Sequence, residues 1–277
     1  MRNLAAELLV LRKRTSSWVL LGVWVLLSLL FSHVLPYITY SGGGGGEFQT
    51  PLSALLPAGL AANLLGGFPF FGGVFALMLG VLTVGSDYGW DTLKTLLTQR
   101  SGRFQVLGAK LAALGVGLVP FVLVIFIGGA VASLLIASAE NAAVEWPSAW
   151  ELIRALGAAW LILASWAAFG VMLAVLSRGT ALAIGLGILY TLVIEGLLSA
   201  LATQVSWLEA LVQYSIRANA YSLVSTLGVG SEALSGNGPG AFSGPFVDGG
   251  QAILVLGAYV VGFLGLSAVV FRSRDIA

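Results

Sequence analysis

The chain contains no cysteine and little charge. Without cysteine it can form no disulfide, no thiolate nucleophile and no cysteine-ligated metal site. Charged residues make up 9% of the 277 residues, whereas they are about a quarter of an ordinary soluble domain. A soluble fold of this size could not keep the remaining apolar surface away from water, because interiors grow slowly with chain length. The composition therefore indicates a membrane protein.

Motifs for nucleotide and acid–base chemistry are also missing. No G-x-x-x-x-G-K-[ST] sequence occurs, and the glycine run 42–46 lacks the lysine and following helix of a phosphate-binding loop. We therefore expect no ATP hydrolysis by this chain alone, no enzymatic activity and no cofactor in it. The only histidine, His33, has no paired serine and aspartate, so we predict a packed or interfacial residue. The net charge of +1 gives no indication of a nucleic-acid partner.

What the sequence does have is long apolar runs. Hydrophobic residues make up 58% of it, and about 20 consecutive apolar residues are enough to cross a bilayer. We predict an all-α polytopic membrane protein, a single transmembrane domain over residues 1–277. A cleaved signal peptide fits the first run poorly, because the run is long and no small-residue cleavage site follows it. The six predicted spans are 18–37, 68–85, 106–137, 152–176, 180–201 and 252–271.

The basic residues predict the orientation of these spans. If the N-terminus is cytosolic, six crossings return the C-terminus to the same side, and all but two of the 13 basic residues are then cytosolic. The two external ones are Arg154 and Arg217, beside an excess of external acidic residues. We therefore predict that both termini are cytosolic. The predicted cytosolic residues are Arg2, Arg12, Lys13, Arg14, Lys94, Arg100, Arg103, Lys110, Arg178, Arg272 and Arg274.

The N-terminal segment 1–16 is amphipathic. Leu4, Leu8 and Leu11 recur at helical spacing, which predicts an elbow helix in the inner membrane interface. The basic run from Arg12 through Lys13 to Arg14 then leads into the first span and also fits a positive-inside flank.

The loop 86–104, between the second and third spans, contains a second short amphipathic stretch. Asp91 fits a helix N-cap, and Leu93, Leu96 and Leu97 form one apolar face. These leucines need cover, and the sequence alone leaves the membrane surface and a protein partner equally open.

Two further features concern the external half. Segment 203–250 begins with a helix-like part and ends in a Gly/Ser/Pro-rich tract; its apolar part is either re-entrant or rests on the outer surface. Its predicted apolar face consists of Trp207, Leu208, Leu211 and Val212. Glu195 is the only acidic residue well inside a span, the usual mark of a functional site. Counting about 1.5 Å per residue from Arg178 places it near the outer headgroups, which favours an interfacial or packing role.

The loop after the second span carries a degenerate pattern: an acidic residue, a capping pair, Leu-x-x-Leu-Leu, an arginine, and Gly-x-Lys at the head of the third span. In this pattern and in its overall layout the chain resembles the permease subunits of ABC-2 type ATP-binding-cassette transporters. Asp87 and Asp91 stand where that family usually has glutamate and glycine. The residues that carry the resemblance are Asp87, Asp91, Thr92, Leu93, Leu96, Leu97, Arg100, Arg103, Gly108 and Lys110.

The resemblance implies that residues 87–103 form a cytosolic coupling helix that docks in a groove of a separate ATPase subunit, with the elbow against the same subunit. It further implies two such ATPase subunits, which bind ATP and Mg, and a second permease chain, identical or different. Such a complex would export a substrate across a prokaryotic cell membrane. A secondary transporter or channel, and a membrane enzyme or anchor, are the alternative interpretations.

Overall fold

A computed structural model describes most of the chain as helix. The described residues are 2–42, 50–89, 103–202, 204–230, 234, 242 and 244–273. All regular structure within them is helical. Six of the described helical segments are long and apolar enough to cross a membrane, which confirms the predicted all-helical fold with six apolar segments of spanning length. These segments are Thr15–Ser41, Phe68–Asp87, Gln105–Ala139, Ala149–Ser177, Thr180–Ala202 and Gly249–Ser273.

Several spans are assembled from more than one helical piece, because π-helical turns interrupt them. The first span joins α2 (Thr15–Leu29), η1 (Leu30–Val34) and α3 (Leu35–Ser41); the second joins η3 (Phe68–Gly72) to α6 (Gly73–Gly89). The third and fourth are α8 (Arg103–Ala139) and α9 (Ala149–Ser177). The fifth joins α10 (Thr180–Ile188), η4 (Leu189–Ile194) and α11 (Glu195–Ala202), and the sixth is α15 (Gly249–Ser273).

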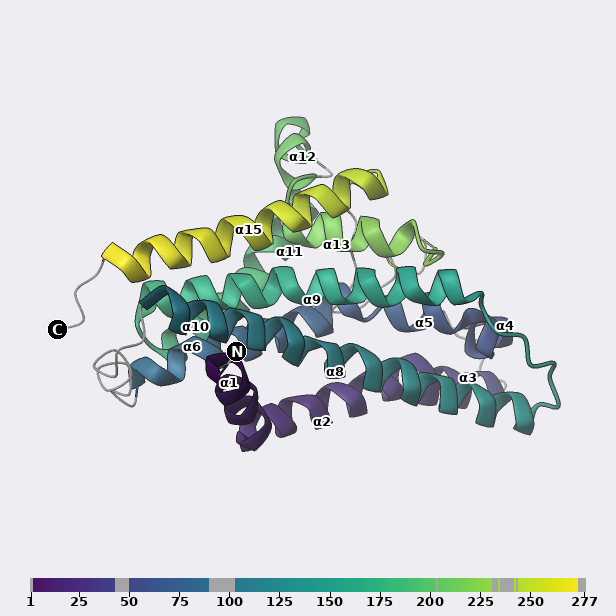
Figure 1. Cartoon of the computed structure of the whole chain (residues 1–277). Coiled ribbons are helices and arrows are strands. Elements are labelled where there is room, and N and C mark those ends of the chain that lie inside the picture. Colours follow the sequence, from purple (N-terminus) through teal and green to yellow (C-terminus); the bar gives the residue numbers. More distant parts are fainter. Residues whose placement is uncertain are drawn as a thin grey trace.

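Helix α9 lies at the centre of the bundle and packs against α6, α10 and α15 (Figure 1). It begins at a capping box, in which the Ser148 side chain accepts from the Glu151 backbone N–H and the Glu151 carboxylate accepts from the Ser148 backbone N–H. Its contact with α6 is a close backbone approach. A Cβ on Gly80 would collide with the Ala167 backbone, and one on Gly170 with the Leu77 backbone. Small residues allow such contacts between membrane helices, where dispersion rather than hydrophobicity stabilises the contact.

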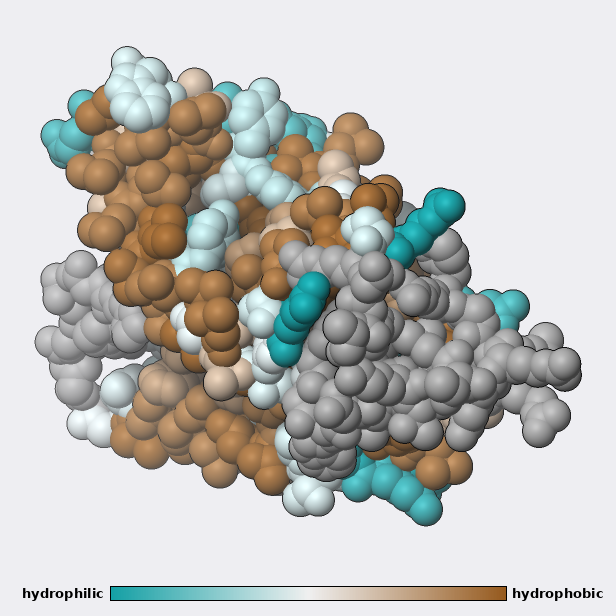
Figure 2. Space-filling view, turned by 90° about the vertical axis from the view of Figure 1, so that its left-hand side faces the viewer, coloured by the Kyte–Doolittle hydropathy of each residue, from teal (hydrophilic) through white to brown (hydrophobic). Residues whose placement is uncertain are grey.

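The N-terminal helix α1 (Arg2–Lys13) runs across the direction of the long helices. It lies toward the same end of the bundle as the last turn of α6, the first turn of α8 and the last turn of α15 (Figure 1). With six crossings, the start of the first span and the end of the last span must lie at the same end of the bundle. Figure 2 views the molecule from that end, where hydrophilic residues form scattered patches beside the hydrophobic sides of the spans.

The first connection at the opposite end folds back against the bundle. It contains α4 (Leu52–Leu55), the 3-10 turn η2 (Pro57–Gly59) and α5 (Leu60–Leu65). Leu55, Leu60, Leu64 and Leu65 are buried, and α5 contacts α8 and α9. This apolar connection, whose helices are too short to cross a membrane, therefore helps to close this end of the core.

The described part of segment 203–250 is partly packed inside the bundle. Helix α13 (Ile216–Ser225) is buried on all sides from Ile216 to Val224, and it packs against α15, α9 and η3. Helix α12 (Ser206–Val212) projects from the bundle (Figure 1). Only part of the predicted apolar face of α12 is covered, since Leu208 and Val212 are buried while Trp207 and Leu211 are exposed.

Candidate functional site

The packing of α1 explains its sequence pattern. Leu4, Leu8 and Leu11 are half-buried and share a face with Glu7. This side of α1 lies on α8, where Leu11 comes within 3.4 Å of the position that a Cβ on Gly117 would occupy. The predicted apolar face is therefore covered, at least in part, by the third span.

A buried lysine joins α1 to both helices that flank the loop 86–104. The Lys110 Nζ of α8 lies 2.9 Å from Glu7 Oε2 of α1 and 2.8 Å from Asp87 Oδ2 of α6. Lys110 is 6% exposed. Removing one partner from a buried ion pair typically costs about 3–5 kcal/mol, because the other charge stays buried without compensation. We call Glu7, Asp87 and Lys110 the inner triad.

Arg14 makes a second connection at the same end. It stands between α1 and α2, and its guanidinium donates to the Leu82 carbonyl at 2.5 Å and to Ser86 Oγ at 2.6 Å. Both acceptors belong to the last turns of α6, toward the end of the helix where a cation is favoured. The basic run thus has two environments, since Arg14 is bound to α6 while Arg12 and Lys13 are exposed.

These contacts involve the two helices that flank the predicted coupling segment, and they do not include the centre of that segment. Asp87 lies in the last turns of α6, and the backbone of Arg103 begins α8. The predicted docking residues Asp91, Thr92, Leu93, Leu96, Leu97 and Arg100 lie outside the described residues. What the structure brings together is α1 and the two ends from which that segment emerges.

A second charged cluster lies in the opposite half of the molecule. Glu195 begins α11 directly after the π-helical turn η4 and is 1% exposed. Its Oε1 accepts from the backbone N–H of Arg217 in α13 at 3.4 Å, and the Arg217 side chain is 5% exposed. Opposite charges buried together join the fifth span to α13. Glu195 is therefore packed inside the protein, which agrees with the packing role that the sequence favoured beside an interfacial one.

Aromatic rings complete this second cluster. The Arg217 guanidinium carbon lies 5.5 Å from the centre of the Phe70 ring and 5.7 Å from that of Tyr221, within the range of a cation–π contact. Tyr221 stacks on Phe242 with ring centres 4.8 Å apart. Burial raises the pKa of the Tyr221 phenol to about 12, so this ring stays neutral at physiological pH.

His33 is also inside the protein, as its lack of catalytic partners predicts. It is 1% exposed in the π-helical turn η1, with Nδ1 2.7 Å from Ser32 Oγ and Nε2 3.0 Å from Ser133 Oγ of α8. No group of three or more His, Asp or Glu side chains in the described part of the chain is arranged to hold a metal ion.

Comparison with protein families matches most of the chain. The family model described as "Protein of unknown function (DUF2705)" matches residues 58–277. The chain belongs to the DUF2705 family. Comparison with curated proteins gives no match.

The matched part of this DUF2705 chain contains Asp87, Lys110, Glu195 and Arg217, whereas Glu7 lies N-terminal to it. Sequence reasoning placed Arg217 on the external side, and it identified no partner for Glu7 or Arg217. A signal existed for Lys110: a lysine at the fifth position of the predicted apolar span 106–137 needs an acidic partner nearby. Nothing in the sequence indicates that one partner is 103 residues away.

Proposed function

We propose that the chain is the permease subunit of an ABC-2 type ATP-binding-cassette transporter. It moves a substrate across a prokaryotic cell membrane, in the export direction, and takes its energy from ATP bound with Mg by a separate cytosolic ATPase subunit. The functional complex contains two permease chains and two ATPase subunits. Substrate passes between the two permease chains.

The inner triad is the observation that carries this proposal. A transporter driven from the cytosol needs a rigid connection between the surface that receives force and the spans that move. Lys110 ties α1 to α6 and α8 within 3 Å, and Arg14 adds two further bonds between the start of the first span and α6. Force on α1 or on the loop 86–104 therefore reaches three spans at once.

Helix length adds to the argument. Helix α8 has 37 residues and so extends about 55 Å at 1.5 Å per residue, well beyond a hydrocarbon core of about 30 Å. Such a helix extends beyond the hydrocarbon core at one end at least, and we propose that its first turns do so. In the proposed orientation that end is cytosolic and forms a lever between the ATPase subunit and the third span.

Copurification tests the proposal. The tagged chain is extracted from its native membranes in mild detergent, and we expect an ATPase subunit with Walker motifs in equal amount. Leu93→Asp or Leu97→Asp places a charge in the predicted docking face and lowers the amount of ATPase subunit several-fold, while the chain stays in the membrane. A charge at an exposed apolar residue elsewhere, such as Leu254→Asp, would be a poor control because it would disturb any apolar site there. The matched control is therefore Lys94→Ser, on another face of the same predicted helix. Equal recovery of ATPase subunit with Leu93→Asp and Lys94→Ser overturns the docking assignment.

A secondary transporter is the second candidate, and the Glu195–Arg217 cluster favours it. Secondary transporters place ionisable groups at interruptions of their helices, and Glu195 directly follows a π-helical turn. The two candidates differ in their energy source. Uptake into inverted vesicles that requires ATP and survives collapse of the proton gradient supports the ATP-driven candidate, and the reverse result supports the secondary transporter.

A further inference from the structure

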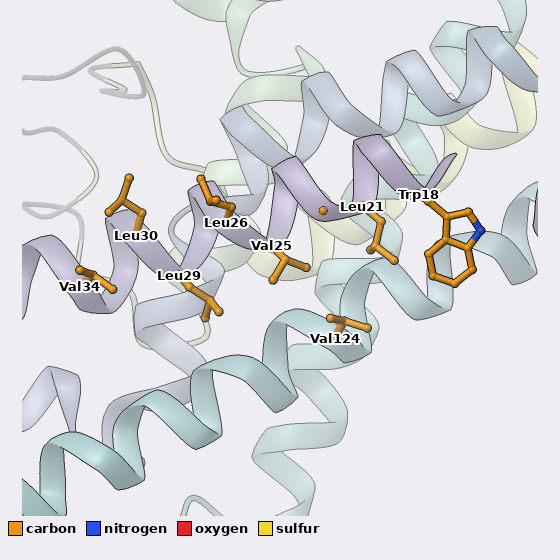
Figure 3. Close-up of a pocket in the computed structure, with 9 residues that line it drawn as sticks. Trp18, Leu21, Val25, Leu26, Leu29, Leu30, Val34 and Val124 are labelled. Atoms are coloured by element: carbon orange, nitrogen blue, oxygen red, sulfur yellow. The ribbon is translucent and has the colours of Figure 1, made fainter. Parts of the chain in front are cut away.

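An apolar groove runs along the first span, between α2 and α8 (Figure 3). Its volume is about 540 Å³. All of its lining side chains are apolar, from Trp18 to Val34 along the first span and Val124 across from them on α8 (Figure 3). A groove of this kind in a membrane-spanning segment takes a hydrocarbon ligand, because no lining side chain except the Trp18 indole carries a polar atom.

The shape of the groove fits one extended chain. The distance from Trp18 to Val34 along the helix is about 24 Å at 1.5 Å per residue, which covers most of a hydrocarbon core about 30 Å thick. Gly22 lines the groove and borders open space, since a Cβ built on it would meet no atom within 4 Å. Lipid tails are as apolar as leucine, so shape rather than hydrophobicity selects an acyl chain here.

One end of the groove carries positive charge. The Trp18 indole N–H donates to the Arg12 carbonyl at 2.6 Å, so the end of α1 lies directly beside the groove. Arg12 and Lys13 are exposed, and the ion pairs found among the described residues involve neither of them. Two exposed cations beside an apolar groove at the membrane interface suit a phosphate headgroup.

We propose that this groove binds an anionic phospholipid, with an acyl chain between α2 and α8 and the phosphate against Arg12 and Lys13. The proposal requires only that the first span lies in a membrane, and it does not rest on an ATPase partner. The lipid would fill the space between the first and third spans and hold α1 at the membrane surface.

Native mass spectrometry of the full chain, purified from bilayers of equal phosphatidylglycerol and phosphatidylcholine, tests the acyl-chain part. We expect retained phosphatidylglycerol on the wild type. Gly22→Phe fills the groove and removes most of this lipid. The control is Gly257→Phe on α15, where a Cβ also meets nothing within 4 Å, and it retains the wild-type amount. Equal retention by Gly22→Phe and the wild type, or equal loss by the two glycine variants, overturns the proposal.

The exposed charges provide a test that does not alter packing. Each basic residue at the surface contributes about 1 kcal/mol toward an anionic lipid, so Arg12→Gln with Lys13→Gln lowers the ratio of retained phosphatidylglycerol to phosphatidylcholine roughly thirtyfold. An unchanged ratio overturns the headgroup assignment.

A second copy of the chain is the competing occupant. Because the chain has no cysteine, Val25→Cys introduces a single thiol in the groove, which can form a disulfide only with another molecule. An efficient disulfide-linked dimer in membranes overturns lipid binding at this groove.

Discussion

Lys110 Nζ and Asp87 Oδ2 lie 2.8 Å apart across the gap between α6 and α8. The same Nζ lies 2.9 Å from Glu7 Oε2, so one lysine holds three helices that meet at the end of the bundle. A charge buried at this point needs both carboxylates, and the predictions below start from that requirement.

Lys110→Met should lower the stability of the fold. The substitution leaves Glu7 and Asp87 facing one another without a cation, at a cost of about 3–5 kcal/mol, which corresponds to a fall in the thermal midpoint on the order of 10 °C. The measurement is a thermal melt of the purified chain in detergent. Lys13→Met, which removes an exposed lysine from α1, is the control and should melt as the wild type does. A Lys110→Met protein that melts like the control would show that the inner triad contributes nothing.

Arg14→Gln should loosen α1 from the bundle, because it removes two bonds to the last turns of α6. Cross-linking can report this in a chain without cysteine. Leu11→Cys with Gly117→Cys places two thiols where α1 meets α8, and a short bis-thiol reagent should join them rapidly. We expect several-fold slower joining when Arg14→Gln is added, and no change when Arg154→Gln, at an exposed position of α9, is added. Equal rates in all three proteins would contradict this role of Arg14.

Arg217→Met should destabilise the chain by a few kcal/mol, because it leaves the Glu195 carboxylate buried without a nearby cation. Adding Glu195→Gln should recover part of that loss, since the remaining side chain is then neutral. Thermal melts of the single and double variants measure the coupling between the two residues. The control is Arg154→Met at an exposed position of α9. An absence of recovery in the double variant would contradict the pairing.

Because the Tyr221 phenol is buried, we expect the folded chain to lose stability at alkaline pH. Its folded pKa is raised by burial to about 12, above the ordinary value near 10, so the folded chain holds this proton more tightly than the unfolded chain. The contribution is fully present below pH 10 and is lost as the pH rises toward 12, up to about 3 kcal/mol. Tyr221→Phe should therefore lose less stability than the wild type between pH 9 and pH 11 in thermal melts. Tyr214→Phe, at an exposed position, should follow the wild type, and a Tyr221→Phe profile parallel to it would refute the prediction.

The spans were predictable from sequence because each is a local property of about 20 residues. Each predicted range overlaps one of the six apolar helical segments of the structure. The partners of the buried charges were not predictable in the same way. Glu7 and Lys110 are 103 residues apart, and Glu195 and Arg217 are 22 apart; hydropathy carries no information about which helices become neighbours.

Helix α13 shows a second limit of prediction from the sequence, which concerns buried polar residues. Arg217 and Asn219 suggest a polar surface, yet both are buried. Asn219 Nδ2 donates to the Gln213 and Ser215 carbonyls, and the Ser222 hydroxyl accepts from the Val247 N–H. Polar side chains can be buried when such bonds satisfy them, and a pattern of residue types does not reveal those bonds.

Side-selective labelling is the most direct test of an ATPase-driven permease, because the loop 86–104 must face the compartment that contains ATP. Lys94→Cys gives the chain a single thiol, and Trp146→Cys in the exposed connection between α8 and α9 is the reference for the other side. With a membrane-impermeant maleimide, we expect Trp146→Cys to react in intact cells and Lys94→Cys to react only after the membrane is permeabilised. Labelling of Lys94→Cys in intact cells would contradict the proposed orientation and, with it, the proposed function.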